Sequence, residues 1–223
     1  AVNVSAVGTR TAVTEHVVPT NQDAIFTAST SKMGSAAVAL TAGTVATDNV
    51  WFAPAGTTTF VAGATMTTAT GTATSILAPA TAGTYKLFVI DASANVSAAS
   101  TATLTVDTTV PTATLPATTG AATNDVDSIV ATFSEALSIN GVAVADNADV
   151  KTSFTASAGF TITTAIYNLA AKTVTFTLSA GAVNGSTITH TTATATALTD
   201  AVGNVYPAKV YTYTAATTLW ATN

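Results

Sequence analysis

Aspartate near predicted turns is the residue type with the most chemical potential in this sequence. Nine of the eleven acidic residues are Asp, and most of them lie in predicted turns or at a linker. Calcium takes roughly six to eight oxygen ligands from carboxylates, Asn side chains and backbone carbonyls. The candidate calcium ligands are Asp91, Asn95, Asp107, Asp125, Asp127, Asp200 and Asn204. Because Asp and Asn are also the standard turn residues, ordinary turn chemistry is the competing interpretation.

These candidates would work together only if the fold brings their turns to one place. We expect Asp91, Asn95 and Asp107 at one end of a first domain. Further ligands would come from the second half of the chain, either from Asp125 and Asp127 or from Asp200 and Asn204. An ion at the junction would fix the angle between two domains. It would also stabilise the fold in place of disulfide bonds, since the chain has no cysteine.

Catalytic motifs are missing from the sequence. His16 and His190 both lie in threonine-rich strand patterns, and no Gly-x-Ser-x-Gly elbow accompanies them. An exposed strand position is the simpler interpretation of each histidine. Two histidines without cysteine disfavour structural zinc, and single glycines do not make a phosphate-binding loop. We therefore expect no enzyme activity.

The elements that position these residues are predicted to be strands. Residues alternate between apolar and polar in Thr101–Val106 and Thr173–Leu178, which is the pattern of a half-buried strand. The predicted inward faces are Ala102, Leu104 and Val106; Val174, Phe176 and Leu178; Ile129, Ala131 and Phe133; and Phe160, Ile162 and Ile166. Helical spacing is nearly absent. Short strands between turn residues predict an all-β sandwich or barrel.

A break near residues 107–111 divides the chain. Pro111 cannot continue a central strand, and each side has about the size of one immunoglobulin-like domain. We predict one β-sandwich over residues 1–108 and a second over 109–223. Both halves end alike, with Asp91 to Asn95 and Asp200 to Asn204 each followed by a closing strand.

The composition excludes several classes of protein. Only 8% of residues are charged, against roughly 25% in ordinary soluble domains, while 48% are hydrophobic. The net charge is −5 and the six basic residues are scattered, so a nucleic-acid partner is not expected. No apolar run reaches the roughly 18 residues of a membrane helix, so membrane insertion is not expected either.

Several segments resemble bacterial immunoglobulin-like domains of surface-layer proteins and large cell-surface adhesins. They are GTYKLFVIDASANVSAAS with LTVDTTVP in the first half, and IVATFSEAL, VTFTLSAGA and LTDAVGN in the second. The resemblance implies two tandem immunoglobulin-like β-sandwich domains, secreted to the bacterial cell surface or cell wall. It also implies that Glu135 caps a turn at a strand edge. Ala94 stands where such domains usually carry glycine.

Threonine on the outer strand faces suggests how such a protein works. Threonine favours strands, and its neutral hydroxyl avoids most of the cost of burying a charge in a contact. Few charges also leave edge strands without their usual protection against pairing. We expect a self-assembling structural subunit of a surface layer, whose partners are neighbouring copies in a lattice and further domains of the same chain. The alternative is a spacer or stalk in a large cell-surface adhesin.

Overall fold

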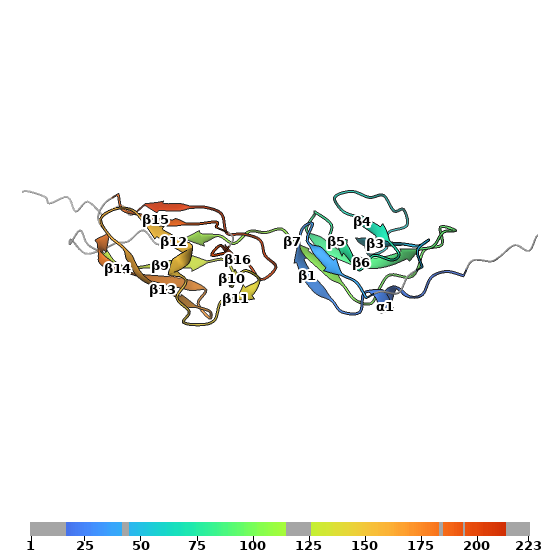
Figure 1. Ribbon diagram of the computed structural model, residues 1–223, viewed down its shortest axis with the longest axis horizontal. Coiled ribbons are helices and arrows are strands. Elements are labelled where there is room, and N and C mark those ends of the chain that lie inside the picture. Colours follow the sequence, from blue (N-terminus) through green and yellow to red (C-terminus); the bar gives the residue numbers. More distant parts are fainter. Residues whose placement is uncertain (1–16, 42–44, 115–125, 183–184, 194, 213–223) are drawn as a thin grey trace, which may run out of the picture. The chain divides into compact units, whose positions relative to one another are not determined.

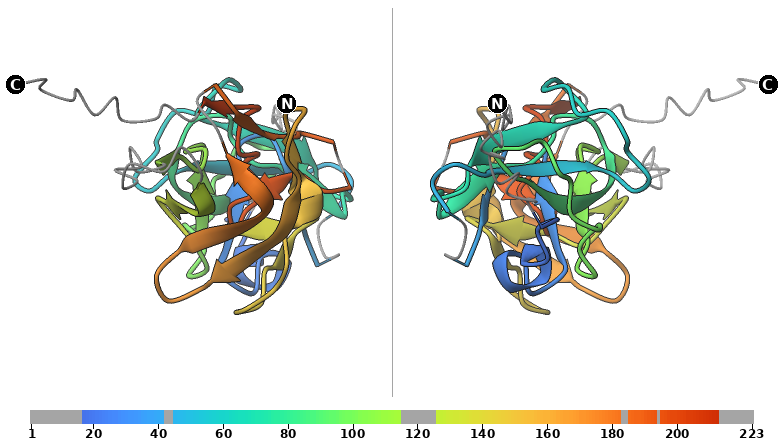
Figure 2. Two further views of the ribbon diagram at one scale, coloured as in Figure 1. Left: turned by 90° about the vertical axis from the view of Figure 1, so that its left-hand side faces the viewer. Right: turned by 90° about the vertical axis from the view of Figure 1, so that its right-hand side faces the viewer.

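The chain is almost entirely β in the part that the structure describes, which confirms the all-β part of the predicted fold class. This computed structural model describes residues 17–41, 45–114, 126–182, 185–193 and 195–212 (Figure 1). The helical segments within these ranges are α1 (Gln22–Ile25) and a 3-10 turn at Lys151–Ser153. Figure 2 shows strands and loops throughout, with α1 as one short blue coil. No helix among the described residues has the length and hydrophobicity needed to cross a membrane.

Two compact units make up the chain. Residues 1–30 and 35–105 form the first, here called the N-terminal unit, and residues 31–34 and 106–223 form the C-terminal unit. Each contains several β-sheets and its own group of buried apolar side chains.

A five-stranded sheet lies largely in the N-terminal unit, although most of β1 and the end of β7 are assigned to the C-terminal unit. Its order is β1-β7-β6-β3-β4, and β2 with β5 forms a separate two-stranded sheet. The strands are β1 (Thr30–Met33), β2 (Ala37–Ala39), β3 (Asn49–Pro54), β4 (Thr67–Thr70), β5 (Ser75–Leu77), β6 (Gly83–Ile90) and β7 (Leu104–Asp107).

The core of this unit follows from strand alternation. In the antiparallel pair β3–β6, Val50 lies opposite Val89 and Phe52 opposite Leu87, so all four side chains share one face. Each is at most 1% exposed. The inward face predicted for Ala102, Leu104 and Val106 is confirmed, because all three side chains are buried.

Three sheets build the C-terminal unit. Their orders are β13-β14-β9-β8, β11-β10-β16 and β12-β15-β17. The strands are β8 (Ala113–Thr114), β9 (Val126–Phe133), β10 (Ser138–Ile139), β11 (Val142–Ala143), β12 (Phe154–Ala156), β13 (Ile162–Asn168), β14 (Thr173–Ala182), β15 (Thr187–His190), β16 (Leu198–Thr199) and β17 (Val210–Thr212). Two predicted inward faces, one on β9 and one on β14, are confirmed as part of the core of this unit.

The inward face predicted for β13 is wrong beyond its first residues. The register with β14 shifts between Ile162 and Thr164, as at a β-bulge. A one-residue shift exchanges the two faces of a strand. Ala165 and Tyr167 are therefore fully buried, whereas Ile166 is only half-buried.

The predicted exposed position of His190 is also wrong. Its side chain is 1% exposed, at an inward position of β15. The ring packs against Phe154 and Tyr206, with centroid distances of 5.6 Å and 4.7 Å. Nε2 accepts a hydrogen bond from the Leu198 N–H at 3.3 Å, and Nδ1 lies 3.2 Å from the Pro207 carbonyl oxygen. His190 is thus a core residue, and His16 lies outside the described residues.

Candidate functional site

A tight turn after β16 holds one buried carboxylate, that of Asp200. Its Oδ1 accepts hydrogen bonds from the backbone N–H groups of Val202, Gly203 and Asn204 at 2.9, 2.7 and 2.8 Å. Its Oδ2 accepts one from the Asn204 side-chain amide at 2.7 Å. The residue is 1% exposed, and these four hydrogen bonds satisfy carboxylate oxygens that are buried away from solvent.

Asn204 connects this turn to the end of β7. The amide that donates to Asp200 also donates to the backbone carbonyl of Asp107, at 3.1 Å. The Asp107 side chain is itself oriented, because its Oδ1 accepts a hydrogen bond from the Thr109 N–H at 2.8 Å. Two predicted ligands far apart in sequence, Asp107 and Asp200, are thereby brought together.

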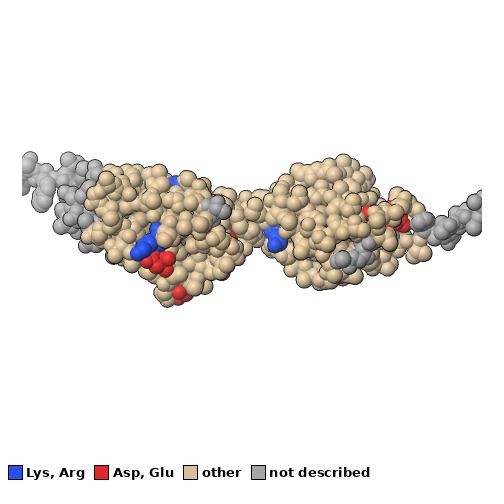
Figure 3. Space-filling view, in the orientation of Figure 1, with Lys and Arg blue, Asp and Glu red and all other residues tan. Residues whose placement is uncertain are grey.

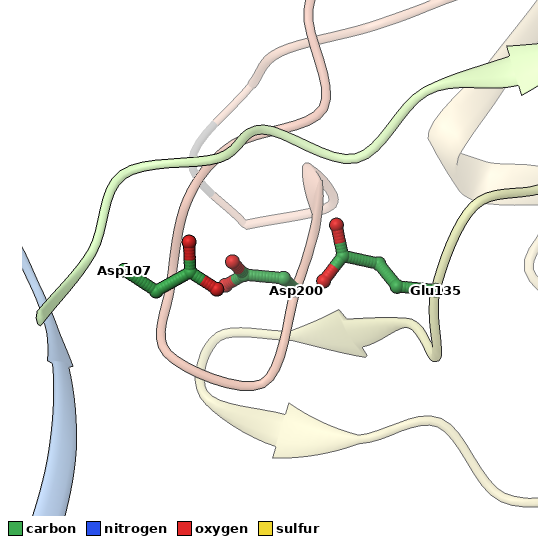
Figure 4. Close-up of side chains that lie close together, drawn as sticks. All are labelled: Asp107, Glu135 and Asp200. Carbon is green, nitrogen blue, oxygen red and sulfur yellow. The ribbon is translucent and has the colours of Figure 1, made fainter. Parts of the chain in front are cut away.

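Glu135 completes a cluster of three carboxylates. One carboxylate oxygen from each of Asp107, Glu135 and Asp200 lies within 4.8 Å of the others. Figure 4 shows the three side chains converging from three separate segments of the C-terminal unit. The prediction that Glu135 caps a turn is wrong, since its carboxylate makes no hydrogen bond with the described residues and lies beside two other acids.

The negative charge of the cluster is only weakly compensated among the described residues. Burial raises the pKa of the Glu135 carboxyl above its ordinary value, and the neighbouring charges of Asp200 and Asp107 raise the pKa further. Lys172 acts in the opposite direction, as the smallest contribution. Its ammonium group is already hydrogen-bonded to the Ser134 carbonyl at 3.3 Å. The fold therefore holds Glu135 where its ionised form is disfavoured.

A hard divalent cation is the ligand that this geometry suits. Calcium binds oxygen at about 2.3–2.6 Å, so two oxygens on one ion can lie up to roughly 5 Å apart. The separations within the cluster fit that limit. All three donors are carboxylates, which favours calcium, magnesium or manganese over zinc or copper. Backbone carbonyls and water would have to supply the remaining ligands.

Asp91 and Asn95 form an equivalent turn in the N-terminal unit. The Asp91 Oδ1 accepts the N–H groups of Ser93 and Asn95 at 2.9 and 2.8 Å, and its Oδ2 accepts the Asn95 amide at 2.9 Å. The residue before each asparagine has a positive φ, +65° at Ala94 and +104° at Gly203. The turn therefore forms although alanine replaces glycine.

The expectation that Asp91, Asn95 and Asp107 share one end of a domain is wrong. After Asn95 the chain runs back antiparallel along β6, with Ser97 bonded to Val89 and then Ser100 to Leu87. Strand β7, which ends at Asp107, continues in that direction away from Asp91. Asp91 and Asp107 consequently lie toward opposite ends of β6.

The remaining predicted ligands take no part in either group as described. Asp125 lies outside the described residues, and Asp127 lies within β9 with its side chain not described. Sequence reasoning missed Glu135 as a candidate ligand because no second acid lies near it in the chain. Its position two residues after the buried Phe133, at a strand end, is the signal that was available.

Comparisons with known proteins give distant similarities to solved structures and nothing closer. No protein-family model matches the chain, and no curated protein matches it. Among solved structures, the chain is similar to one described as "Biofilm associated protein - BSP domain", with 15% sequence identity and a TM-score of 0.30. The match covers 84% of this chain and 28% of that chain, so this chain spans less than a third of that structure's length.

Proposed function

We propose that this chain is a structural, non-catalytic segment of a bacterial cell-surface protein, built from two tandem immunoglobulin-like β-sandwich domains. Calcium held by Asp107, Glu135 and Asp200 stiffens the connection between them. Asn204 orients the site through Asp200 and the carbonyl of Asp107.

The observation that carries this proposal is the cluster of three carboxylates, for which the described residues provide no ion pair. Like charges so close together oppose folding unless a proton or a metal ion neutralises them. Asp107 follows Thr105, the last residue of the N-terminal unit, by two positions. An ion on Asp107 would therefore restrain the segment through which one unit continues into the other.

A location at the cell surface is supported by composition and motifs. The chain has no cysteine, few charges and strand motifs that resemble bacterial surface domains. Figure 3 shows large areas without Lys, Arg, Asp or Glu. Calcium is abundant outside cells, so an extracellular structural domain can use it in place of a disulfide.

Thermal unfolding with calcium and with chelator tests the ion. An ion that binds only the folded chain stabilises it by about 2.7 kcal/mol at a free concentration of 100 times Kd. We expect calcium to raise the melting temperature of the wild type. Asp107→Asn and Glu135→Gln should each weaken this response strongly. In chelator, Glu135→Gln should melt higher than the wild type, because it removes a disfavoured charge.

Asp146→Asn is the matched control for this experiment. Asp146 is exposed and accepts the Leu169 N–H through Oδ1, so the substitution removes one negative charge outside the cluster and keeps an acceptor oxygen. Its calcium response should equal that of the wild type. A wild-type melting temperature unchanged by calcium, or an undiminished response in Glu135→Gln, would reject the calcium site.

Self-assembly into a surface layer is the second candidate function, and the edge strands favour it. β4 and β17 lie at the edges of their sheets and carry no Asp, Glu, Lys or Arg. Val210 on β17 is 59% exposed. Uncharged edges lack a common protection against pairing with another chain.

Electron microscopy separates this candidate from an adhesin spacer. Two-dimensional sheets formed by the protein in calcium would support a surface layer, whereas isolated rods both with and without calcium would support a spacer. Thr68→Lys places a charge at an exposed position of β4. If β4 edges pair in the lattice, this variant should remain dispersed under conditions where the wild type forms sheets.

A further inference from the structure

A second pair of acidic residues lies where β3 begins and β6 ends, in the N-terminal unit. The two strands are antiparallel, and Asn49 lies opposite Ile90. The next position outward sets Asp48 opposite Asp91. Facing residues on antiparallel strands have Cα atoms about 4.5–5.5 Å apart and side chains on the same face.

The shared face of Asp48 and Asp91 is the core face of the sheet. Asp48 precedes Val50 by two positions, and Asp91 follows Val89 by two, while Val50 and Val89 are themselves paired and buried. Both carboxylates therefore extend an apolar row at its end. This alternation explains why Asp48 is only 7% exposed.

Asp48 has no side-chain partner among the described residues. Burial raises the pKa of its carboxyl, and the neighbouring Asp91 raises that pKa further. Asp91 is oriented differently, since the turn that ends at Asn95 supplies its oxygens with N–H donors. The pair thus joins one fixed carboxylate to one that belongs to a buried residue and accepts no hydrogen bond from the described part of the chain.

We propose that Asp48 and Asp91 form a second cation site, for a hard divalent ion such as calcium. A buried carboxylate facing another carboxylate is costly unless a proton or a cation lies between them. The fixed orientation of Asp91 lowers the entropy cost of binding, and Asp48 supplies the unbalanced charge. The site belongs to the N-terminal unit and shares no residue with Asp107, Glu135 and Asp200.

The position of the pair explains what a second ion would do. Asp91 and Asp107 lie toward opposite ends of β6, as described above. An ion on Asp48 and Asp91 would join the start of β3 to the end of β6. It would tighten that end of the sheet, and so stabilise the N-terminal unit itself.

Calcium titration of the whole chain by calorimetry tests this site independently of the first. We expect two ions per wild-type chain, one in Glu135→Gln, one in Asp48→Asn and none in the double variant. Asp48→Asn keeps the side-chain size and should melt higher than the wild type in chelator. In this variant, the melting temperature of the N-terminal unit should no longer rise when calcium is added.

Different outcomes overturn different proposals. If Glu135→Gln binds no calcium, or Asp48→Asn binds as many ions as the wild type, the second site is rejected. If Asp48→Asn binds none while the wild type binds one, the C-terminal cluster is the one that fails.

A separate measurement covers the case in which Asp48→Asn does not fold. Calcium added to Glu135→Gln should shift the NMR signals of the Asp91–Asn95 amides, and an absence of shifts overturns the proposal. In Glu135→Gln, the melting temperature of the N-terminal unit could instead rise on acidification but not with calcium. That result would mean that Asp48 and Asp91 share a proton, and it would also overturn the proposed cation site.

Discussion

Asn204 donates its side-chain amide to the buried carboxylate of Asp200 at 2.7 Å. The pair Asn95 and Asp91 repeats this bond at 2.9 Å in the other unit. In both turns the aspartate N–H also donates to the asparagine carbonyl, at 3.0 and 3.1 Å. The chain thus uses one turn twice, each time to fix a carboxylate beside another acid.

Removal of the Asn204 amide should destabilise the C-terminal unit. Asn204→Ala leaves the Asp200 Oδ2 and the Asp107 carbonyl without this donor. Loss of a partner from a buried charged group costs about 1–3 kcal/mol. We expect a loss in this range by urea unfolding, and a smaller loss for Asn95→Ala, because Asp91 is less buried than Asp200. Equal stability of Asn204→Ala and the wild type would contradict the role given to this amide.

Ala94 should cost the first turn some stability. Its φ of +65° lies in the left-handed region, which is unfavourable for a residue with a Cβ by roughly 1–2 kcal/mol. Ala94→Gly removes this strain but adds freedom to the unfolded chain, at about 0.4–1 kcal/mol. We expect a net gain of up to about 1 kcal/mol in the free energy of unfolding.

Gly203→Ala is the reciprocal substitution and should act in the opposite direction. Its φ of +104° lies beyond the left-handed well that L residues tolerate. We expect a loss of more than about 1 kcal/mol. Chemical unfolding of both variants checks the pair, and a stabilising Gly203→Ala would show that the backbone of this turn relaxes.

Strand faces could be predicted from the sequence wherever a strand keeps its register. The alternation on β9, on β14 and from Ala102 into β7 needs only local information, and those faces were correct. The face of β13 failed because the register shift near Thr164 depends on pairing with β14. A bulge inserts a residue without a distinctive sequence signal here.

The acidic sites could be predicted only in part, for a reason of topology. The turns that end at Asn95 and Asn204 are local motifs, so their aspartates were found. Glu135 and Asp48 come from other strands and approach these turns only through sheet pairing. His190 failed similarly, since nothing in Thr-Ile-Thr-His shows that its side of β15 faces Phe154 and Tyr206.

Tyr206 and Tyr167 should respond oppositely to loss of their hydroxyl groups. The Tyr206 ring is 1% exposed, and its hydroxyl has no hydrogen-bond partner among the described residues. Tyr206→Phe removes a buried unsatisfied group and should be neutral or stabilising by up to about 1 kcal/mol. The Tyr167 hydroxyl accepts the Leu137 N–H at 3.2 Å in a fully buried place.

Tyr167→Phe is therefore the matched control, and should cost about 1–2 kcal/mol because it leaves the Leu137 N–H unpaired. Both tyrosines lie in the core of the same unit, so one urea unfolding experiment compares them directly. A clearly destabilising Tyr206→Phe would mean that its hydroxyl has a partner in the folded protein, such as a buried water.

The pH dependence of stability near neutrality should depend on His190. Burial lowers the pKa of its imidazole, and the hydrogen bond with the Pro207 carbonyl opposes this only in part. The folded state therefore binds the proton more weakly than the unfolded chain, whose histidine has a pKa of about 6.5. The stabilising contribution is complete above this value and is lost as the pH falls toward the lowered folded pKa.

The surroundings of the His190 ring also indicate that protonation destabilises the folded state. A proton on Nε2 would break the bond from the Leu198 N–H, and the ring is enclosed by Phe154 and Tyr206. We expect the free energy of unfolding to fall between pH 7 and pH 5.5 in the wild type. His190→Gln cannot titrate, so its stability should change less over this interval even if it is lower throughout. His16→Gln is the control and should retain the wild-type slope. An unchanged slope in His190→Gln would assign the acid sensitivity to another group.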